Sequence, residues 1–341
     1  MPGSDDAAGP VGDESTVDAA IEFGRTSGGG GAATINRVWD NPAAGMFDGV
    51  EQVPGAAKPD PILIADNVSR SFGGLRAVDV DHVEIQRGAI TALIGPNGAG
   101  KTTFFNLLTQ FDTPDSGAVT FDGDRTTGVR SHELAARGMV RTFQLTKVLA
   151  KMTVIDNMML AAQAQTGESM WRALLNGWRG QERGVNERAL QILDEFNMTH
   201  MKDEFAGALS GGQRKLLEMA RAMMAQPRLI MLDEPMAGVN PALTQSLLGH
   251  VKRLRSEGIS VMFVEHDMDV VQDISDWVIV MAEGSVIAEG PPRAIGENPA
   301  VIDAYLGSSH AALTEEIREA VGLVDEPTTD VDHGESGDGD E

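Results

Sequence analysis

Two hydrophobic periodicities alternate along residues 61–307. Short, continuous apolar runs are typical of strands covered on both faces of a parallel sheet, and the clearest are AITALIG (89–95), RLIMLD (228–233) and SVMFVE (260–265). Other runs alternate apolar with polar positions and carry turn residues, which favours an antiparallel section at the sheet's edge. These are ILIADNVSRSF (62–72), GAVTFDG (117–123) and WVIVMAEGSVIAEG (277–290). With helical segments between the strands, the pattern predicts an α/β fold with a mostly parallel core sheet.

The stretch from Leu145 to Gln226 has a different pattern. It contains no strand-like run, and its apolar positions recur at helical spacing in three segments, 152–164, 167–178 and 186–196. We therefore expect a helical subdomain over about 145–226, inserted between the first and second core strands.

Charge divides the chain into three parts. Of the net charge of −24, residues 1–60 contribute −7 and residues 308–341 contribute −10, and both ends are rich in Gly, Asp, Ser and Pro. Such a composition buries too little apolar surface to fold, so we expect two acidic disordered tails around a domain spanning 61–307. Within the first tail, Trp39, Met46 and Phe47 are candidates to anchor a short helix or a partner contact.

Composition also excludes several classes of protein. The chain has no cysteine, which excludes disulfides and thiolate metal sites and favours a reducing cytoplasm. The start of the chain does not resemble a signal peptide, and no run reaches 18 consecutive apolar residues, so a membrane role is expected to come through a partner. The acidic balance disfavours nucleic acid as a partner, because phosphate backbones are themselves negative.

The stretch GPNGAGKT, Gly95–Thr102, matches the phosphate-binding pattern G-x-x-x-x-G-K-[ST] and stands between a predicted strand and a predicted helix. Glycines let several backbone N–H groups point into one concavity, at the positive end of the helix dipole. Lys101 can then reach the terminal phosphates, and the Thr102 hydroxyl can ligate Mg²⁺. The predicted nucleotide-binding residues of this turn are Gly95, Pro96, Asn97, Gly98, Ala99, Gly100, Lys101, Thr102 and Thr103.

Two carboxylates end the apolar run LIMLDEP. Asp233 is placed to hold Mg²⁺, and Glu234 to polarise a water molecule that attacks the terminal phosphate. The guanine-specific N-K-x-D element is absent from the sequence, which weighs against a GTPase.

A serine and two glycines open a predicted amphipathic helix in ALSGGQRKLLEMARAMM, 208–224. They form a second anion site, which one nucleotide on one subunit does not need. Here the chain resembles the nucleotide-binding subunits of ABC transporters, and the family's LSGGQ signature is present without change as Leu209, Ser210, Gly211, Gly212 and Gln213. The resemblance implies a head-to-tail dimer, in which the signature of one subunit closes over ATP held by the turn of the other.

Further residues match the family in its order along the chain. Phe72 stands where the family has an aromatic ring that stacks on adenine. Gln144 matches the glutamine that touches Mg²⁺ or the attacking water and couples the site to the membrane subunits, and His266 matches the switch histidine that contacts the γ-phosphate. In the loop after the acidic strand, Asn240 replaces the more usual aspartate, which puts signalling through that loop across the dimer in doubt.

The segments RTFQ, MTVIDNMMLA, LDEPMAGVNP and ENPAVIDAYLG are similar to those of branched-chain amino acid ATP-binding subunits. The resemblance implies an ATP-hydrolysing importer subunit at the cytoplasmic face of the membrane. Its partners would be two permeases, a second ATP-binding subunit and, indirectly, an external solute-binding protein. Whether the two ATPases are identical stays open, as does a role in urea, amide or lipopolysaccharide transport.

Two functional interpretations outside transport also stay open. The first is a soluble ABC ATPase that acts on ribosomes or DNA; its usual marks, a tandem second unit or long coiled coils, are absent from this sequence. The second is a regulatory nucleotide-binding module without turnover, against which the intact Lys101, Asp233, Glu234 and His266 argue.

Overall fold

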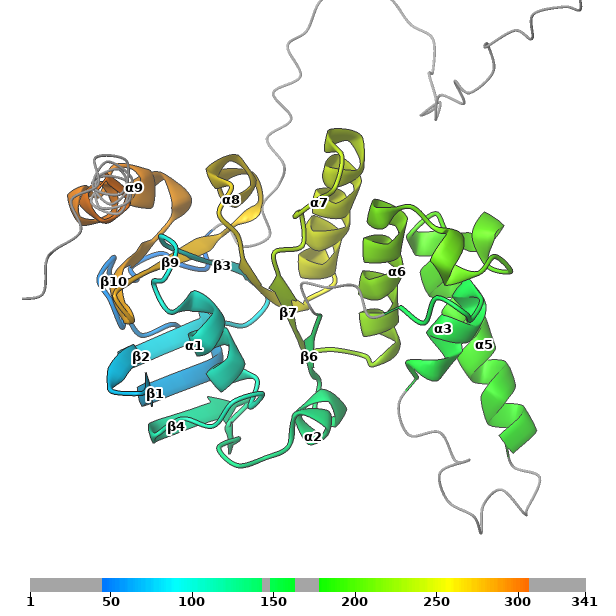
Figure 1. Cartoon of the computed structure of the whole chain (residues 1–341), viewed down its shortest axis with the longest axis horizontal. Coiled ribbons are helices and arrows are strands. Elements are labelled where there is room, and N and C mark those ends of the chain that lie inside the picture. The colour runs from blue at the N-terminus through cyan, green and yellow to red at the C-terminus, as the bar shows by residue number, and fades with distance from the viewer. Residues whose placement is uncertain (1–44, 143–147, 163–177, 307–341) are drawn as a thin grey trace, which may run out of the picture. The chain divides into compact units, whose positions relative to one another are not determined.

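Two β-sheets and a group of helices make up the part of the chain that the computed structural model describes, residues 45–142, 148–162 and 178–306 (Figure 1). The core sheet has the strand order β10 (Ser285–Gly290), β9 (Trp277–Ala282), β3 (Ile90–Ile94), β8 (Ser260–Val264), β7 (Leu229–Asp233), β6 (Met139–Arg141). The second sheet has the order β2 (Leu75–Gln86), β1 (Pro61–Phe72), β4 (Ser116–Phe121), β5 (Asp124–Arg125). The α/β fold with a mostly parallel core sheet is confirmed.

One strand of the predicted antiparallel section lies elsewhere. The hairpin over 277–290 belongs to the core sheet, where β9 runs parallel to β3 and only β10 is antiparallel. The prediction is correct for β10 and wrong for β9, since all but the last residue of β9 are buried, much as in β3, β7 and β8. The sequence pattern also missed β2, which pairs with β1 along its whole length, and the short strand β6.

Alternate residues of the core strands enter two separate hydrophobic cores. On β8, Val261 and Phe263 join a core with the helices that follow residue 153, whereas Met262 and Val264 join the core of α1 (Lys101–Leu108) and the antiparallel sheet. This alternation follows from the two-residue period of a strand, and it explains why the core strands read as unbroken apolar runs.

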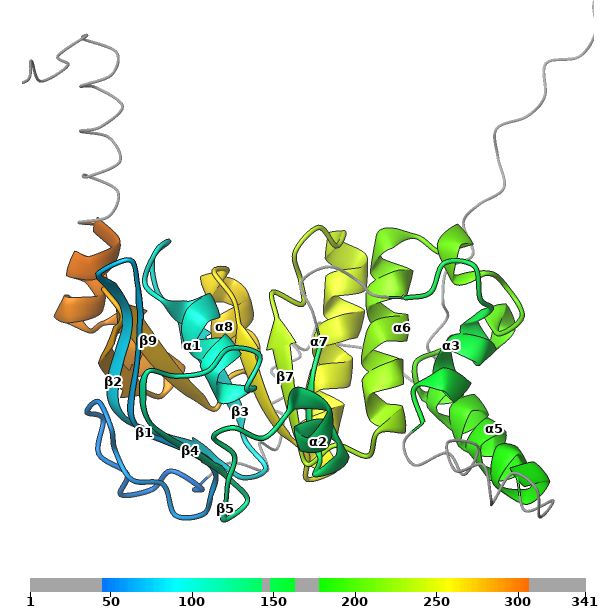
Figure 2. The same ribbon diagram turned by 60° about the horizontal axis from the view of Figure 1, so that its bottom comes forward.

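Helices cover the sheet and build the predicted helical segment. Their bounds are α1 (Lys101–Leu108), α2 (Ser131–Ala136), α3 (Val154–Leu160), α5 (Trp178–Glu195), α6 (Gly211–Met224), α7 (Pro241–Ser256), α8 (Met268–Ile274) and α9 (Pro292–Gly296). In both views α3, α5 and α6 lie together, beyond α7 as seen from α1 (Figures 1 and 2). The described residues of 145–226 contain no strand, only an isolated bridge between Thr153 and Phe205. The segment 167–178 lies almost wholly outside the described residues.

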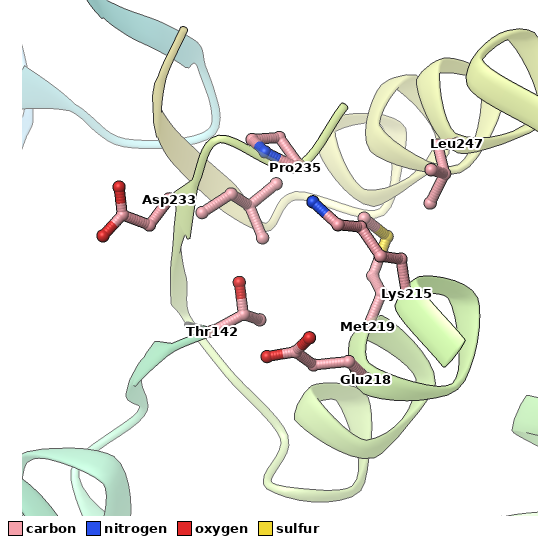
Figure 3. Close-up of a pocket in the computed structure, with 8 residues that line it drawn as sticks. Thr142, Lys215, Glu218, Met219, Asp233, Pro235 and Leu247 are labelled. Carbon is pink, nitrogen blue, oxygen red and sulfur yellow. The ribbon is translucent and has the colours of Figure 1, made fainter. Parts of the chain in front are cut away.

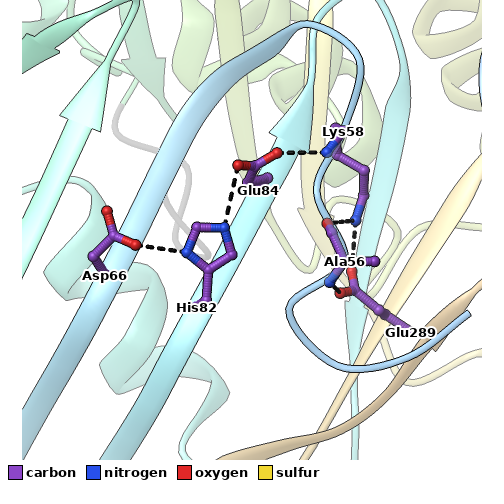
Figure 4. Close-up of polar contacts among 6 residues, drawn as sticks. All are labelled: Ala56, Lys58, Asp66, His82, Glu84 and Glu289. Carbon is purple, nitrogen blue, oxygen red and sulfur yellow. Dashed lines mark hydrogen bonds and ion pairs between the residues drawn. The ribbon is translucent and has the colours of Figure 1, made fainter. Parts of the chain in front are cut away.

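Residues 45–58, which we call the N-terminal strap, correct the prediction that 1–60 is a disordered tail. Lys58 forms an ion pair of 3.0 Å with Glu289 of β10, and the two side chains are 1% and 0% exposed (Figure 4). The backbone N–H of Ala56 donates to the other oxygen of Glu289 at 2.7 Å. The composition of this segment suggested disorder, but partners more than 200 residues away in the sequence hold it in place.

Aromatic stacking and a second carboxylate add to these contacts. Phe47 stacks on Trp277 of β9, with 4.7 Å between ring centroids. The N–H of Lys58 donates to Glu84 of β2 at 2.5 Å, and Glu84 also contacts His82 (Figure 4). The ordered domain therefore begins before residue 61. Trp39 and the remainder of the two predicted tails lie outside the described residues.

Candidate active site

Three predicted motifs meet at one edge of the core sheet. Strands β3, β8 and β7 are parallel neighbours, and Val264 on β8 pairs with Leu93 on β3 and with Asp233 on β7. The carboxyl ends of these strands thus lie side by side, followed by the phosphate turn, His266 and Glu234. In an open α/β sheet, ligands bind at this edge.

The phosphate turn depends on glycine at positions that contact other backbone segments. Gly95 and Gly100 have φ angles of +148° and +92°, which L side chains rarely adopt. A Cβ on Gly95 would lie 2.0 Å from the carbonyl oxygen of Met281, and one on Gly100 would lie 2.4 Å from that of Ala77. The turn is therefore held against β9 and β2. Gly100 is also the N-cap of α1 and has no side chain to cap the helix, so the first N–H groups of α1 remain available to an anion.

Lys101 lies over its own turn. Its ammonium donates to the carbonyl oxygens of Gly95 and Pro96 at 2.6 and 2.8 Å. Burial lowers the pKa of Lys101, and the nearby Glu234 carboxylate acts in the opposite direction. The lysine thus stands at the concavity where the motif requires a cation, while Asn97, Gly98 and Thr102 are exposed at its rim.

Arg141, at the end of β6, joins two of the motifs. Its guanidinium donates to Asp233 at 2.9 Å and to Asn106 of α1 at 2.7 Å, and it lies over the ring of Phe105. The Arg141 and Asp233 side chains are only 11% and 7% exposed. This contact orients the Asp233 carboxylate relative to the helix that begins at the phosphate turn.

Glu234 follows β7 in a left-handed backbone conformation, with φ of +45°, which is uncommon for a residue other than glycine. Its N–H donates to the carbonyl of Val264 at 3.1 Å, and its own carbonyl accepts from the Lys215 ammonium at 2.8 Å. Figure 3 shows Lys215 reaching from α6 toward Pro235, across a pocket that Asp233 also lines. The bend turns the chain at the catalytic edge, where the side chain of Glu234 is only partly buried.

Glu265 directly follows β8 and binds backbone N–H groups near the ends of β7 and β8. Its carboxylate is buried and accepts the N–H of Met236 at 2.9 Å and that of His266 at 3.4 Å. Burial raises the pKa of Glu265, and the two backbone donors oppose that shift. The side chain of His266 itself is 69% exposed, at the edge where a phosphate would lie.

The signature residues occupy the N-terminus of α6. Ser210 and Gln213 form a reciprocal capping box, in which the Gln213 N–H donates to the serine hydroxyl and the Ser210 N–H donates to the glutamine side chain. Gly212 is buried against Leu243 of α7, whereas Gly211 has open space around it. Leu209 is buried. In both views α7 lies between α1 and α6, so the signature and the phosphate turn are not neighbours within one chain (Figures 1 and 2).

Of the other residues singled out in the sequence, the structure describes Phe72 and Asn240 but not Gln144. Phe72 ends β1 at the tip of the β1–β2 hairpin, is 48% exposed and has Arg70 over its ring. Gln144 lies outside the described residues. Asn240 is the N-cap of α7 and accepts the N–H of Leu243 at 2.9 Å, so it caps the helix as an aspartate would.

Sequence reasoning missed Arg141, Lys215 and Glu265. Arg141 is part of the quoted RTFQ segment, and Lys215 lies in the signature helix, so both were near recognised motifs. Glu265 directly precedes His266 after an apolar run, and a buried strand that ends in a carboxylate is a signal that could have identified it. The pattern could not show where these side chains point.

Comparisons with known proteins show the family of this chain. Residues 78–237 match the family model described as ABC transporter, and 285–311 match the one described as branched-chain amino acid ATP-binding cassette transporter. The chain is 42% identical over 252 residues to a probable branched-chain amino acid transport ATP-binding protein, LivG, of Archaeoglobus fulgidus, covering 74% of this chain and 98% of that protein. The chain belongs to the ATP-binding subunits of ABC transporters.

Two further relatives support this family assignment. A high-affinity branched-chain amino acid transport ATP-binding protein, BraF, of Pseudomonas aeruginosa is 40% identical, over 73% of this chain and 99% of that protein. Among solved structures, a nucleotide-free ATP-binding cassette from an ABC transporter superposes with a TM-score of 0.63 at 36% identity, over 72% of this chain and 98% of that one. As an ABC transporter ATP-binding subunit, the chain is an ATPase. Within 45–142, 148–162 and 178–306, no helix combines the length and apolarity needed to cross a membrane.

Proposed function

We propose that this subunit hydrolyses ATP to drive the import of branched-chain or related hydrophobic amino acids. The observation that carries the catalytic part is the meeting of the phosphate turn, the Asp233–Glu234 pair and His266 at adjacent ends of β3, β7 and β8. The solute class is supported by the likeness to branched-chain amino acid transport ATP-binding proteins over nearly their full length.

Each described site residue has a role that its position supports, and Gln144 is assigned its role by the sequence match alone. The turn and Lys101 bind the phosphates, and Phe72 stacks on the adenine. Glu234 directs a water molecule at the γ-phosphate, and His266 contacts that phosphate from β8 as charge develops in the transition state. Gln144 couples these events to the membrane subunits. Such a reaction depends on positioning and charge stabilisation rather than on covalent chemistry.

The donor set of the chain fits Mg²⁺. This ion prefers hard oxygen ligands and is commonly bound by one or two carboxylates, a hydroxyl and the phosphates of its substrate. Thr102 offers an exposed hydroxyl at the start of α1, and Asp233 offers carboxylate oxygens, one of which accepts from Arg141 at 2.9 Å. When bound, Mg²⁺ would neutralise charge on the phosphates. Thr102, Asp233 and Gln144 would hold it.

The signature supports a dimer as the working unit. Because Ser210 and Gly211 are exposed and lie apart from the turn of their own chain, we infer that they contact ATP held by a second ATP-binding subunit. The pair would dock on two permeases at the cytoplasmic face of the membrane, with an external binding protein delivering the solute. Nucleic acid has no part in this proposal.

The experiment begins with the tagged full chain purified from native membranes in detergent. Recovery of permeases and a second ATPase would allow reconstitution in liposomes, with uptake of labelled leucine measured against urea and a polar amino acid. ATP-dependent uptake of leucine alone supports the proposal. Uptake of urea, or recovery only with ribosomal or DNA-repair proteins, contradicts it.

Two variants of the same complex test the residue roles. Glu234→Gln should bind ATP, hold the dimer closed and lose almost all turnover, whereas Lys101→Ala should bind ATP weakly. Full hydrolysis by Glu234→Gln would remove Glu234 from its role, and unchanged ATP affinity in Lys101→Ala would contradict the placement of the phosphates.

A further inference from the structure

The loop between β7 and α7, residues 234–240, is joined to the signature helix at both of its ends. At the first end, the ammonium of Lys215 donates to the carbonyl of Glu234 at 2.8 Å. At the second end, Gly212 packs against Val239 of the loop and Leu243 in the first turn of α7, so that a Cβ there would lie 3.5 Å from Val239 and 1.8 Å from a methyl carbon of Leu243. A movement of α6 therefore has two routes into the loop that carries the catalytic carboxylate.

The Lys215 contact is made to a strained residue. Glu234 has φ of +45°, a conformation that costs a residue with a side chain about 1 kcal/mol or more and persists only where its surroundings hold it. Hydrogen bonds contribute to this: the Glu234 N–H donates to the carbonyl of Val264, and the Glu234 carbonyl accepts from Lys215 and from the Ala237 N–H at 3.2 Å. Of these donors and acceptors, only Lys215 belongs to the signature helix.

The position of Lys215 is unlike that of an ordinary surface lysine. Its side chain crosses the pocket between α6 and the end of β7 (Figure 3). Burial lowers the pKa of Lys215, and four carboxylates act in the opposite direction: Glu218, Glu265, Glu234 and Asp233. A cation held among the acids of the active site is placed to respond when any of them moves or is neutralised.

We propose that Lys215 is a positioning residue that transmits movement of the signature helix to Glu234. Lys215 lies five positions after Ser210, about 7.5 Å along a rigid helix. When Ser210 and Gly211 engage a nucleotide on the second subunit, displacement of α6 carries the ammonium with it and adjusts the Glu234 backbone. Each subunit's signature then controls hydrolysis in its own site. This inference rests on the proposed role of Glu234 and on the proposed dimer.

The test compares three variants of the full chain. Lys215→Met keeps the length of the side chain and removes its charge, Lys215→Arg keeps a donor that can reach the carbonyl, and Lys252→Met removes a lysine of α7 that pairs with Asp273 outside the site. For each variant we would measure kcat, the Kd for ATP, the Hill coefficient for ATP and the Tm.

A positioning role predicts a separation of these quantities. Lys215→Met should lose on the order of 10- to 100-fold in kcat and its cooperativity, while its Kd for ATP stays within about twofold, because the phosphate turn is untouched. Lys215→Arg should recover much of the activity, and Lys252→Met should match the wild-type chain. A wild-type kcat and Hill coefficient in Lys215→Met would overturn the inference, and so would equal losses in kcat, ATP affinity and Tm.

Glu234→Gln, measured in parallel, separates this inference from the proposed function. If Glu234→Gln turns over normally, the proposed catalytic role fails and Lys215 has no carboxylate to position. If Glu234→Gln is inactive while Lys215→Met is normal, the catalytic role stands and the coupling through Lys215 is wrong.

Discussion

The sequence predicts an anion site at the N-terminus of α1 and another at the N-terminus of α6, but the surroundings of the two sites differ in the structure. The turn before α1 is enclosed by backbone of the same chain, with the carbonyls of Met281 and Ala77 directly against Gly95 and Gly100. The N-terminus of α6 is capped by its own Ser210 and Gln213, and Gly211 faces open space. The turn before α1 is shaped by its own chain alone, whereas the N-terminus of α6 is a capped and exposed surface, which in the proposed dimer contacts the nucleotide of the second subunit. Substitutions at equivalent glycines should therefore fail for different reasons.

The largest effect is expected at Gly95. Gly95→Ala places a methyl group 2.0 Å from the Met281 carbonyl oxygen at a φ of +148°, and should lower the free energy of unfolding by about 3 to 5 kcal/mol. Gly98→Ala is the matched control, because its φ of +79° is strained but nothing lies within 4 Å. It should cost about 1 kcal/mol. Urea denaturation without nucleotide measures both, and equal losses would show that the turn is not enclosed.

The second prediction concerns how much the contacts of Arg141 near the phosphate turn stabilise the domain. Arg141→Met leaves the Asp233 carboxylate without the guanidinium that contacts it at 2.9 Å and disconnects it from α1. Because both side chains are largely buried, we expect a loss of about 2 to 4 kcal/mol in the free energy of unfolding. Arg253→Met, which removes an exposed ion pair to Glu257, should cost less than about 1 kcal/mol. If both variants lost a similarly small amount of unfolding free energy, the contacts of Arg141 with Asp233 and α1 would not stabilise the domain as proposed.

The smallest effect on stability distinguishes the two signature glycines. Gly212→Ala must displace Leu243 and should cost about 1 kcal/mol, since the leucine can shift and alanine favours the helix. Gly211→Ala should leave the Tm unchanged, because its Cβ meets nothing within 4 Å. Its ATPase activity should nevertheless fall on the order of 10-fold or more, because in the proposed dimer the methyl group would stand where the second subunit's nucleotide binds. Normal activity in Gly211→Ala would argue that this surface stays free during turnover.

The strap shows where composition misleads. Residues 45–60, which include the strap, are rich in glycine, proline and acids, and the sequence offers no apolar periodicity there. Their order comes from Lys58 and Phe47, whose partners Glu289 and Trp277 lie more than 200 positions later. A local pattern cannot report a contact at that separation, because either residue alone is compatible with a solvated segment.

Sequence alone determined the elements that depend on interactions between residues close together in the chain. The buried parallel strands, the phosphate turn, the serine cap of α6 and the order of Asp233, Glu234 and His266 all follow from side-chain period, glycine conformations and capping chemistry. Tertiary structure decided which elements meet. The strand order placed three motifs at one edge, Arg141, Lys215 and Glu265 gained roles through contacts between elements, and β9 joined the core sheet because both of its faces are covered. Those outcomes depend on packing between distant segments, and the local hydrophobic pattern does not encode which segments become neighbours.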